Sequence, residues 1–135
     1  MPTRREIGYE EARELVGAVA DRLEADALGA AVAVVDAHGE LVAFLRTDGC
    51  PLPSIKIATQ KAFTAARDRQ ESRAIGDTAR KEDFPLTNVG EIGYVGRGGG
   101  VPIELEGEVI GAIGISGLPE AEDMKLARWA AGTVG

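Results

Sequence analysis

Two pairs of apolar segments, each joined by a short turn that contains glycine, restrict the fold of this chain more than any other feature. Residues 30–36 read AAVAVVD and residues 40–46 read ELVAFLR, with the turn AHG between them. Residues 101–117 read VPIELEGEVIGAIGISG, with a polar turn at 106–108. Apolar runs bounded by turn residues are typical of strands, so the pattern predicts two antiparallel hairpins. The first run is apolar almost throughout, which indicates a central strand covered on both faces.

Helical patterns surround these hairpins. Apolar residues recur on one face of residues 9–28, of 54–69 and, less extensively, of 72–81. Ser54 follows a proline and is expected to cap the second of these helices. Pro119 is expected to start the last helix, since proline is well tolerated in a first helical turn.

Residues 82–96 show no clear period and are predicted to form a long loop, with a short strand near 92–95. Loops of this length inside a compact domain are often functional. Helices gathered around an antiparallel sheet predict an α+β fold, and the 135 residues suit one domain spanning 1–135.

The charge balance excludes several classes of partner. The formal net charge is -7, and no basic stripe is present, so we expect neither nucleic acid nor an anionic membrane surface as a partner. No apolar run approaches the roughly 20 residues of a membrane span, and the charged N-terminal stretch does not resemble a signal peptide. We therefore expect a cytoplasmic protein. A single cysteine excludes an internal disulfide, and a single histidine excludes a multi-histidine metal site within one chain.

Residues 96–103 read GRGGGVPI, and this glycine density requires an explanation. A P-loop needs a lysine and a hydroxyl residue directly after its last glycine, but Val-Pro-Ile follows here. No helix begins there either, which excludes the dinucleotide fingerprint. Two interpretations remain: the glycines allow a neighbouring backbone or helix to approach closely, or they leave a slot for a flat ligand.

Several separated motifs resemble one known family. The segment AVVDAHGELVAFLRTDGCPLPSIKIATQKAFTAA, the later segment GGGVPIELEGEVIGAIGISG and Asp123 in the next helix are similar to the GlcG/HbpS-like haem-binding family. The same domain forms the C-terminal part of PduO-type corrinoid adenosyltransferases. The resemblance implies a profilin-like or PAS-like fold with a five-stranded antiparallel sheet, and homo-oligomers. It also implies a small-ligand-binding domain, whose ligand is haem, another tetrapyrrole or a small carboxylate.

The candidate ligand-binding residues combine the glycine stretch and Cys50 with charged positions that match the family, and Asp123 is one of these positions. Lys61 could act as an anion clamp or a base, or it could form an ion pair with Asp123. Arg46 and Asp48 could hold a ligand carboxylate or bind each other. Gly98, Gly99 and Gly100 would form the floor of the pocket, with Lys61 and Arg46 as its walls.

Two residues are candidates for ligation of haem iron. Cys50 precedes a proline, and a cysteine thiolate is a known axial ligand. His38 lies at the tip of the first hairpin, where a turn residue is the alternative interpretation. For Cys50 the alternative is a chance Cys-Pro pair.

An enzyme of small-molecule catabolism is the second functional hypothesis. In that hypothesis Lys61 and Arg46 bind a carboxylated substrate, and Glu91 transfers a proton. Glu91, Tyr94 and Arg97 border the glycine stretch and could supply polar groups to a pocket there; exposed loop residues are the alternative. A third hypothesis is an assembly module that binds no ligand.

Overall fold

The computed structural model describes residues 5–135, so the first four residues of the expected domain lie outside the described part. The elements follow in this order: α1 (Tyr9–Ala25), β1 (Ala31–Asp36), β2 (Leu41–Arg46), α2 (Leu52–Asp68), α3 (Ser72–Lys81), the 3-10 helix η1 (Leu86–Val89), β3 (Gly100–Leu105), β4 (Glu108–Ser116) and α4 (Glu120–Gly132). The strands form one antiparallel sheet in the order β2-β1-β4-β3, so the two predicted hairpins are confirmed and join through β1 and β4. The α+β class is confirmed as well.

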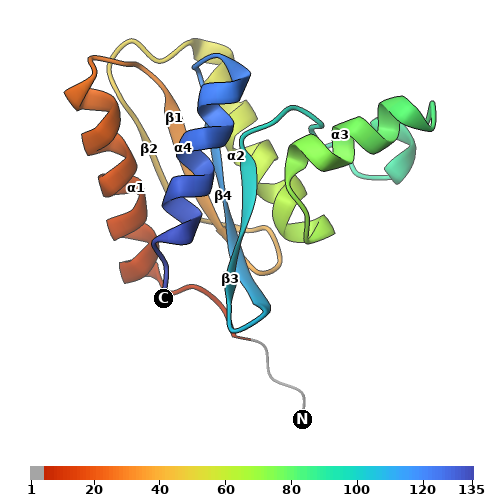
Figure 1. Ribbon diagram of the computed structural model, residues 1–135, viewed down its shortest axis with the longest axis horizontal. Helices are drawn as coiled ribbons and strands as arrows, with labels where there is room; N and C mark the ends of the chain where they lie inside the picture. Colours follow the sequence, from red (N-terminus) through yellow and green to blue (C-terminus); the bar gives the residue numbers. More distant parts are fainter. Residues whose placement is uncertain (1–4) are drawn as a thin grey trace.

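The helices cover both faces of this sheet. Helices α1 and α4 pack on one face, where Val32 and Val34 of β1 point, and α2 packs on the other, where Ala33 and Val35 point. Figure 1 shows α3 at the side of these layers, away from α1. The alternation along β1 explains its apolar sequence, because each of its faces is buried against a helix. None of the described helices is both long and apolar enough to cross a membrane.

The sheet has four strands within residues 5–135, where the resemblance implied five. The short strand expected near 92–95 is absent from the described chain, and a turn takes its place. Tyr94 donates its backbone N–H to the Glu91 carbonyl (3.4 Å), and the N–H of Val95 donates to Thr64 Oγ1 of α2 (2.8 Å). Because α2 accepts the Val95 N–H, this donor is satisfied without a neighbouring strand.

Helix α2 begins two residues earlier than the sequence indicates. It starts at Leu52 after Pro51, so Ser54 is not its cap. Pro53 fits inside the first turn because the first N–H groups of a helix have no intrahelical partner. Ser54 is buried instead, with its hydroxyl 3.2 Å from that of Ser116 at the end of β4.

Helix α2 lies very close to the sheet because small residues line the contact. Its buried face carries Ala58, Ala62, Ala65 and Ala66. A Cβ added to Gly114 of β4 would overlap the carbonyl of Ala58 and lie 2.7 Å from the backbone nitrogen of Ala62. The close approach that the sequence analysis offered as one role for glycine is therefore present at this position.

We expect Gly114→Ala to destabilise the protein by about 1–3 kcal/mol, because the new methyl group meets helix backbone that cannot move aside easily. Urea unfolding would measure this change. Gly17→Ala is the matched control: a Cβ there meets nothing within 4 Å in the interior of α1, so this change should stabilise by ~0.5–1 kcal/mol. Equal stability of the two variants would contradict close packing of α2 on β4.

Candidate functional site

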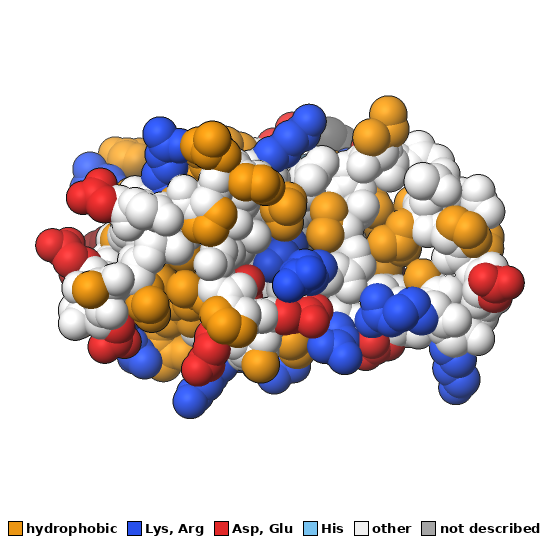
Figure 2. All heavy atoms as spheres, turned by 90° about the horizontal axis from the view of Figure 1, so that it is seen from above, with side chains coloured by type: hydrophobic (Ala, Val, Ile, Leu, Met, Phe, Trp, Pro, Cys, Tyr) orange, Lys and Arg blue, Asp and Glu red, His pale blue; other side chains and the backbone are white. Residues whose placement is uncertain are grey.

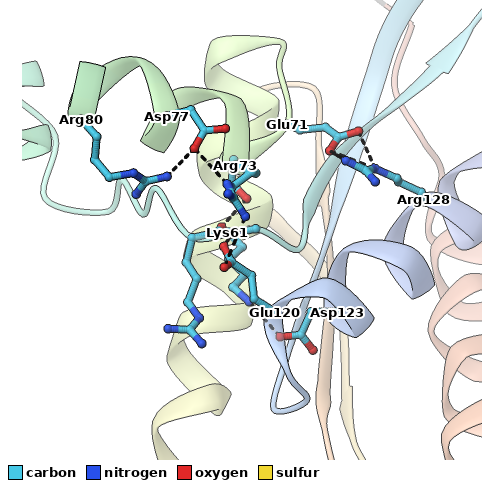
Figure 3. A network of polar contacts seen from close by, with 11 residues as sticks. Lys61, Glu71, Arg73, Asp77, Arg80, Glu120, Asp123 and Arg128 are labelled. Carbon is cyan, nitrogen blue, oxygen red and sulfur yellow. Dashed lines mark hydrogen bonds and ion pairs between the residues drawn. The ribbon is translucent and has the colours of Figure 1, made fainter. Parts of the chain in front are cut away.

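Lys61 of α2 forms a buried ion pair with Asp123 of α4. The lysine side chain is 0% exposed, and its Nζ donates to the Ile115 carbonyl (2.8 Å) and to Asp123 Oδ2 (3.3 Å). The other carboxylate oxygen of Asp123 accepts the backbone N–H of Leu118 (3.1 Å). Figure 3 shows the amine and the carboxylate pointing at each other. This pair is the structural alternative that the sequence analysis considered for Lys61.

The glycine stretch makes room for this pair. Helices α2 and α4 lie on opposite faces of the sheet, so Lys61 reaches Asp123 by passing the start of β3. Gly99 lies beside its path with φ +124°, and a Cβ there would lie 2.9 Å from the lysine Nζ. The glycines and the lysine are therefore neighbours, as the sequence hypothesis assumed. The lysine amine and the Asp123 side chain fill the space beside Gly99.

Burial governs the protonation of this pair. Desolvation lowers the pKa of Lys61 and raises the pKa of Asp123, because each charged form loses its water. The attraction between the two charges opposes both shifts. A fully enclosed amine cannot contact a ligand in this structure, so Lys61 serves to connect α2, β4 and α4.

An open hollow of about 750 Å³ lies beside Glu120, which shares the first turn of α4 with Asp123. It is bounded by α3, residues 83–86, residues 95–97 and Glu120 of α4, and its size falls in the usual range of roughly 300–1,000 Å³ for ligand sites. Its apolar wall consists of Ala79, Phe84, Pro85, Leu86 and Val95. Figure 2 shows basic and apolar side chains side by side over the end of the molecule formed by α3.

Two glycines bring the walls of the hollow together. A Cβ on Gly76 of α3 would overlap the carbonyl of Gly96, and a Cβ on Gly96 would lie 2.7 Å from the Gly76 Cα. Helix α3 can therefore approach the start of the glycine stretch only because both positions lack side chains. Gly96 and Arg97 are the residues of that stretch that line the hollow.

Most charges around the hollow are already paired. Arg73 donates to Asp77 (2.9 Å) and lies 3.4 Å from Glu120, and Arg80 contacts the same Asp77. Figure 3 shows these four side chains in a row from Arg80 to Glu120. Within the described residues Arg97 has no carboxylate partner within 4 Å, so its charge is available to an anionic ligand.

Glu120 connects the hollow to the buried pair. Its Oε2 accepts the backbone N–H of Gly98 at 2.7 Å, and this bond is the main reason why the pKa of Glu120 is lowered. Asp123 follows three residues later, in the first turn of the same helix. The Lys61–Asp123 pair therefore fixes the turn that carries Glu120 to the edge of the hollow.

The structure does not bring Arg46, Asp48 and Cys50 to this hollow. Arg46 ends the edge strand β2, which β1 separates from β4, and it forms no ion pair with Asp48 among the described residues. Cys50 is partly buried beside Pro51, and burial raises the pKa of its thiol despite the nearby Arg46 charge.

His38 and Glu91 also lie outside the lining of the hollow. The His38 ring places Nδ1 at 3.0 Å from Glu6 Oε1, and its side chain is 63% exposed at the tip of the first hairpin. The same turn brings Asp36 close to both groups. Glu91 lies 3.9 Å from Arg67 and does not contact Lys61, so the structure does not bring Glu91 and Lys61 together.

Arg73, Arg80 and Phe84 line the hollow but were not among the site residues predicted from the sequence. The two arginines are seven residues apart on α3, which places them on the same face of the helix, with Gly76 between them. That spacing in the sequence could have identified the two arginines as neighbours on one face of the helix. Phe84 lies in the segment that was interpreted only as a loop, so its place in a pocket depends on the path of the backbone.

Comparisons with known proteins cover nearly the whole chain. The family described as "Haem degrading protein HbpS-like" matches residues 7–131. Protein GlcG of Escherichia coli K12 is 29% identical over 122 residues, which cover 86% of this chain and 85% of GlcG. A crystal structure of a Streptomyces reticuli HbpS double mutant superposes with a TM-score of 0.88 at 27% identity, covering 100% of this chain and 91% of the other. The crystal structure of a PduOC–haem complex gives a TM-score of 0.87 at 26% identity, with 96% of each chain covered.

We expect Lys61→Met to cost about 3–5 kcal/mol of unfolding free energy at pH 8, because it leaves Asp123 buried without its partner. The loss should shrink at pH 5. Burial raises the pKa of Asp123, and removal of the lysine raises it further, so the folded state binds a proton more tightly than the unfolded chain. The folded state of the variant therefore becomes more stable relative to its unfolded chain as the pH falls.

Urea unfolding at both pH values would measure this effect. Lys56→Met is the control on the exposed side of the same helix and should change stability by less than ~0.5 kcal/mol. A small loss for Lys61→Met that does not depend on pH would contradict the assigned role of the buried pair.

Proposed function

The chain belongs to the HbpS-like family of haem-degrading proteins, and from this premise we propose that it binds haem in the hollow between α3 and residues 95–97. The description of the family and the PduOC structure solved as a complex with haem support a haem ligand. The observation that carries the proposal is the combination, in one hollow of about 750 Å³, of an apolar wall and an arginine without a carboxylate partner among the described residues.

The lining suits the organic part of haem. The flat apolar macrocycle would lie against Phe84, Pro85 and Leu86, where it would cover apolar surface that is now exposed to water. Its two propionates are carboxylates, and Arg97 offers them a planar guanidinium that can donate two hydrogen bonds. Another tetrapyrrole with carboxylates would meet the same groups.

The lining suits the iron less well. Haem iron is normally held by histidine, cysteine, methionine or tyrosine, and none of the described residues that line the hollow is of these types. When bound, haem supplies one-electron and O₂ chemistry. The residues of this chain would bind and orient the macrocycle, and we assign them no step in that chemistry.

The assembly state follows only from the resemblance. We propose homo-oligomers on that basis, and light scattering during size-exclusion chromatography is the measurement that tests them.

Ala79→Trp should weaken haemin binding by at least about tenfold, because the indole fills the apolar wall of the hollow. Titration followed by Soret absorbance gives the dissociation constant. Ala74→Trp provides a matched control, since this residue is exposed on the same helix and does not line the hollow. Saturable binding that Ala79→Trp leaves unchanged would place the ligand elsewhere.

Arg97→Glu should weaken haemin binding by roughly tenfold or more, because a charge-assisted hydrogen bond to a propionate is replaced by repulsion. The control is Arg13→Glu, which makes the same change of charge at an exposed position of α1. If both variants lose affinity equally, net charge rather than a contact from Arg97 is responsible.

A further inference from the structure

We propose that the hollow recognises the porphyrin ring and its carboxylates and not the metal, so that metal-free porphyrin binds as tightly as haemin. This inference rests on the proposed haem-binding function and specifies the class of ligand: a planar tetrapyrrole dicarboxylate, with or without iron. It follows from the types of side chain in the lining, which provide apolar contact and cations but no ordinary iron ligand.

The cations of the lining cannot replace such a ligand. Arg73, Arg80 and Arg97 have donors only and stay protonated in proteins, so their guanidinium groups offer no lone pair to a metal. Of the two carboxylates, Glu120 is engaged by the N–H of Gly98 and by Arg73. Asp83 is the remaining oxygen donor, and its contribution can be tested directly.

Two residues of types that ligate haem iron, Tyr94 and Met124, are close in sequence to residues of the lining, but their side chains do not line the hollow. Tyr94 precedes the lining residue Val95, but its hydroxyl lies 3.2 Å from Asp68 and its ring packs edge-on against Phe63 of α2. Met124 of α4 packs its sulfur against Gly98, where an added Cβ would overlap it. Neither side chain is part of the lining.

The two ligand candidates from the sequence lie in other parts of the fold. His38 is at the tip of the β1–β2 turn, where its ring contacts Glu6. Cys50 precedes α2, and its thiol donates to the Pro51 carbonyl (3.4 Å). Neither residue lines the hollow, so we expect neither to change the affinity of a porphyrin held there.

The test compares two ligands on the intact chain: haemin and metal-free protoporphyrin IX, both titrated at low micromolar concentration and followed by quenching of Trp129 fluorescence and by calorimetry. We expect dissociation constants that agree within about threefold. Ala79→Trp should weaken both ligands by the same factor, because the indole fills the apolar wall against which the ring would lie. His38→Ala and Cys50→Ser should leave haemin affinity and the haemin spectrum unchanged. Asp83→Asn, in the lining, should change the affinities of haemin and protoporphyrin IX by the same factor and leave the haemin spectrum unchanged.

Two results would overturn the inference while the haem-binding function stands. One is protoporphyrin IX binding more than about tenfold weaker than haemin. The other is a loss of haemin affinity with a change of the Soret band in His38→Ala or Cys50→Ser, or a change of the Soret band in Asp83→Asn. If haemin itself gives no saturable binding, or if Ala79→Trp leaves it unchanged, the proposed function or its location fails instead, so the two failures are distinguishable.

Discussion

The candidate site depends on one buried interaction, the ion pair that Lys61 of α2 forms with Asp123 of α4. The two helices cover opposite faces of the sheet, and the lysine joins them by passing Gly99 at the start of β3. Removing two charges from water is expensive, and it is tolerated here because the described part of the chain leaves no buried side-chain nitrogen or oxygen without a partner. The pair therefore fixes the positions of α2 and α4 on the two faces of the sheet.

This arrangement also determines the shape of the open hollow. Asp123 anchors the first turn of α4, and the same turn carries Glu120 to the Gly98 N–H and to Arg73 of α3. Helix α3 in turn contacts the chain at Gly96 through a position without a side chain. The glycine stretch thus has two structural roles: its later residues admit the lysine, and its first residue admits α3. The hollow lies along its outer side, where Arg97 forms no ion pair within 4 Å among the described residues.

The sequence predicted the fold well because the dominant signals were local. Apolar periodicity and turn residues gave both hairpins and all four α-helices, whereas the count of five strands came from the resemblance and exceeds the four strands described. The site was harder. The proximity of Lys61 to the glycines was anticipated, but its complete burial depends on how α2 and α4 pack. The hollow itself comes from α3 and residues 83–86, whose approach to Arg97 is a tertiary contact that no local pattern encodes.

The central claim is that the ligand of this HbpS-like chain lies between α3 and the start of the glycine stretch. The most direct test is nuclear magnetic resonance of the ¹⁵N-labelled protein as haemin is added, because the paramagnetic iron broadens amide signals close to it. The account predicts that the amides of Gly76, Phe84 and Arg97 broaden first, while those around His38 and Cys50 stay sharp. Broadening confined to the β1–β2 turn or to the start of α2 would contradict it.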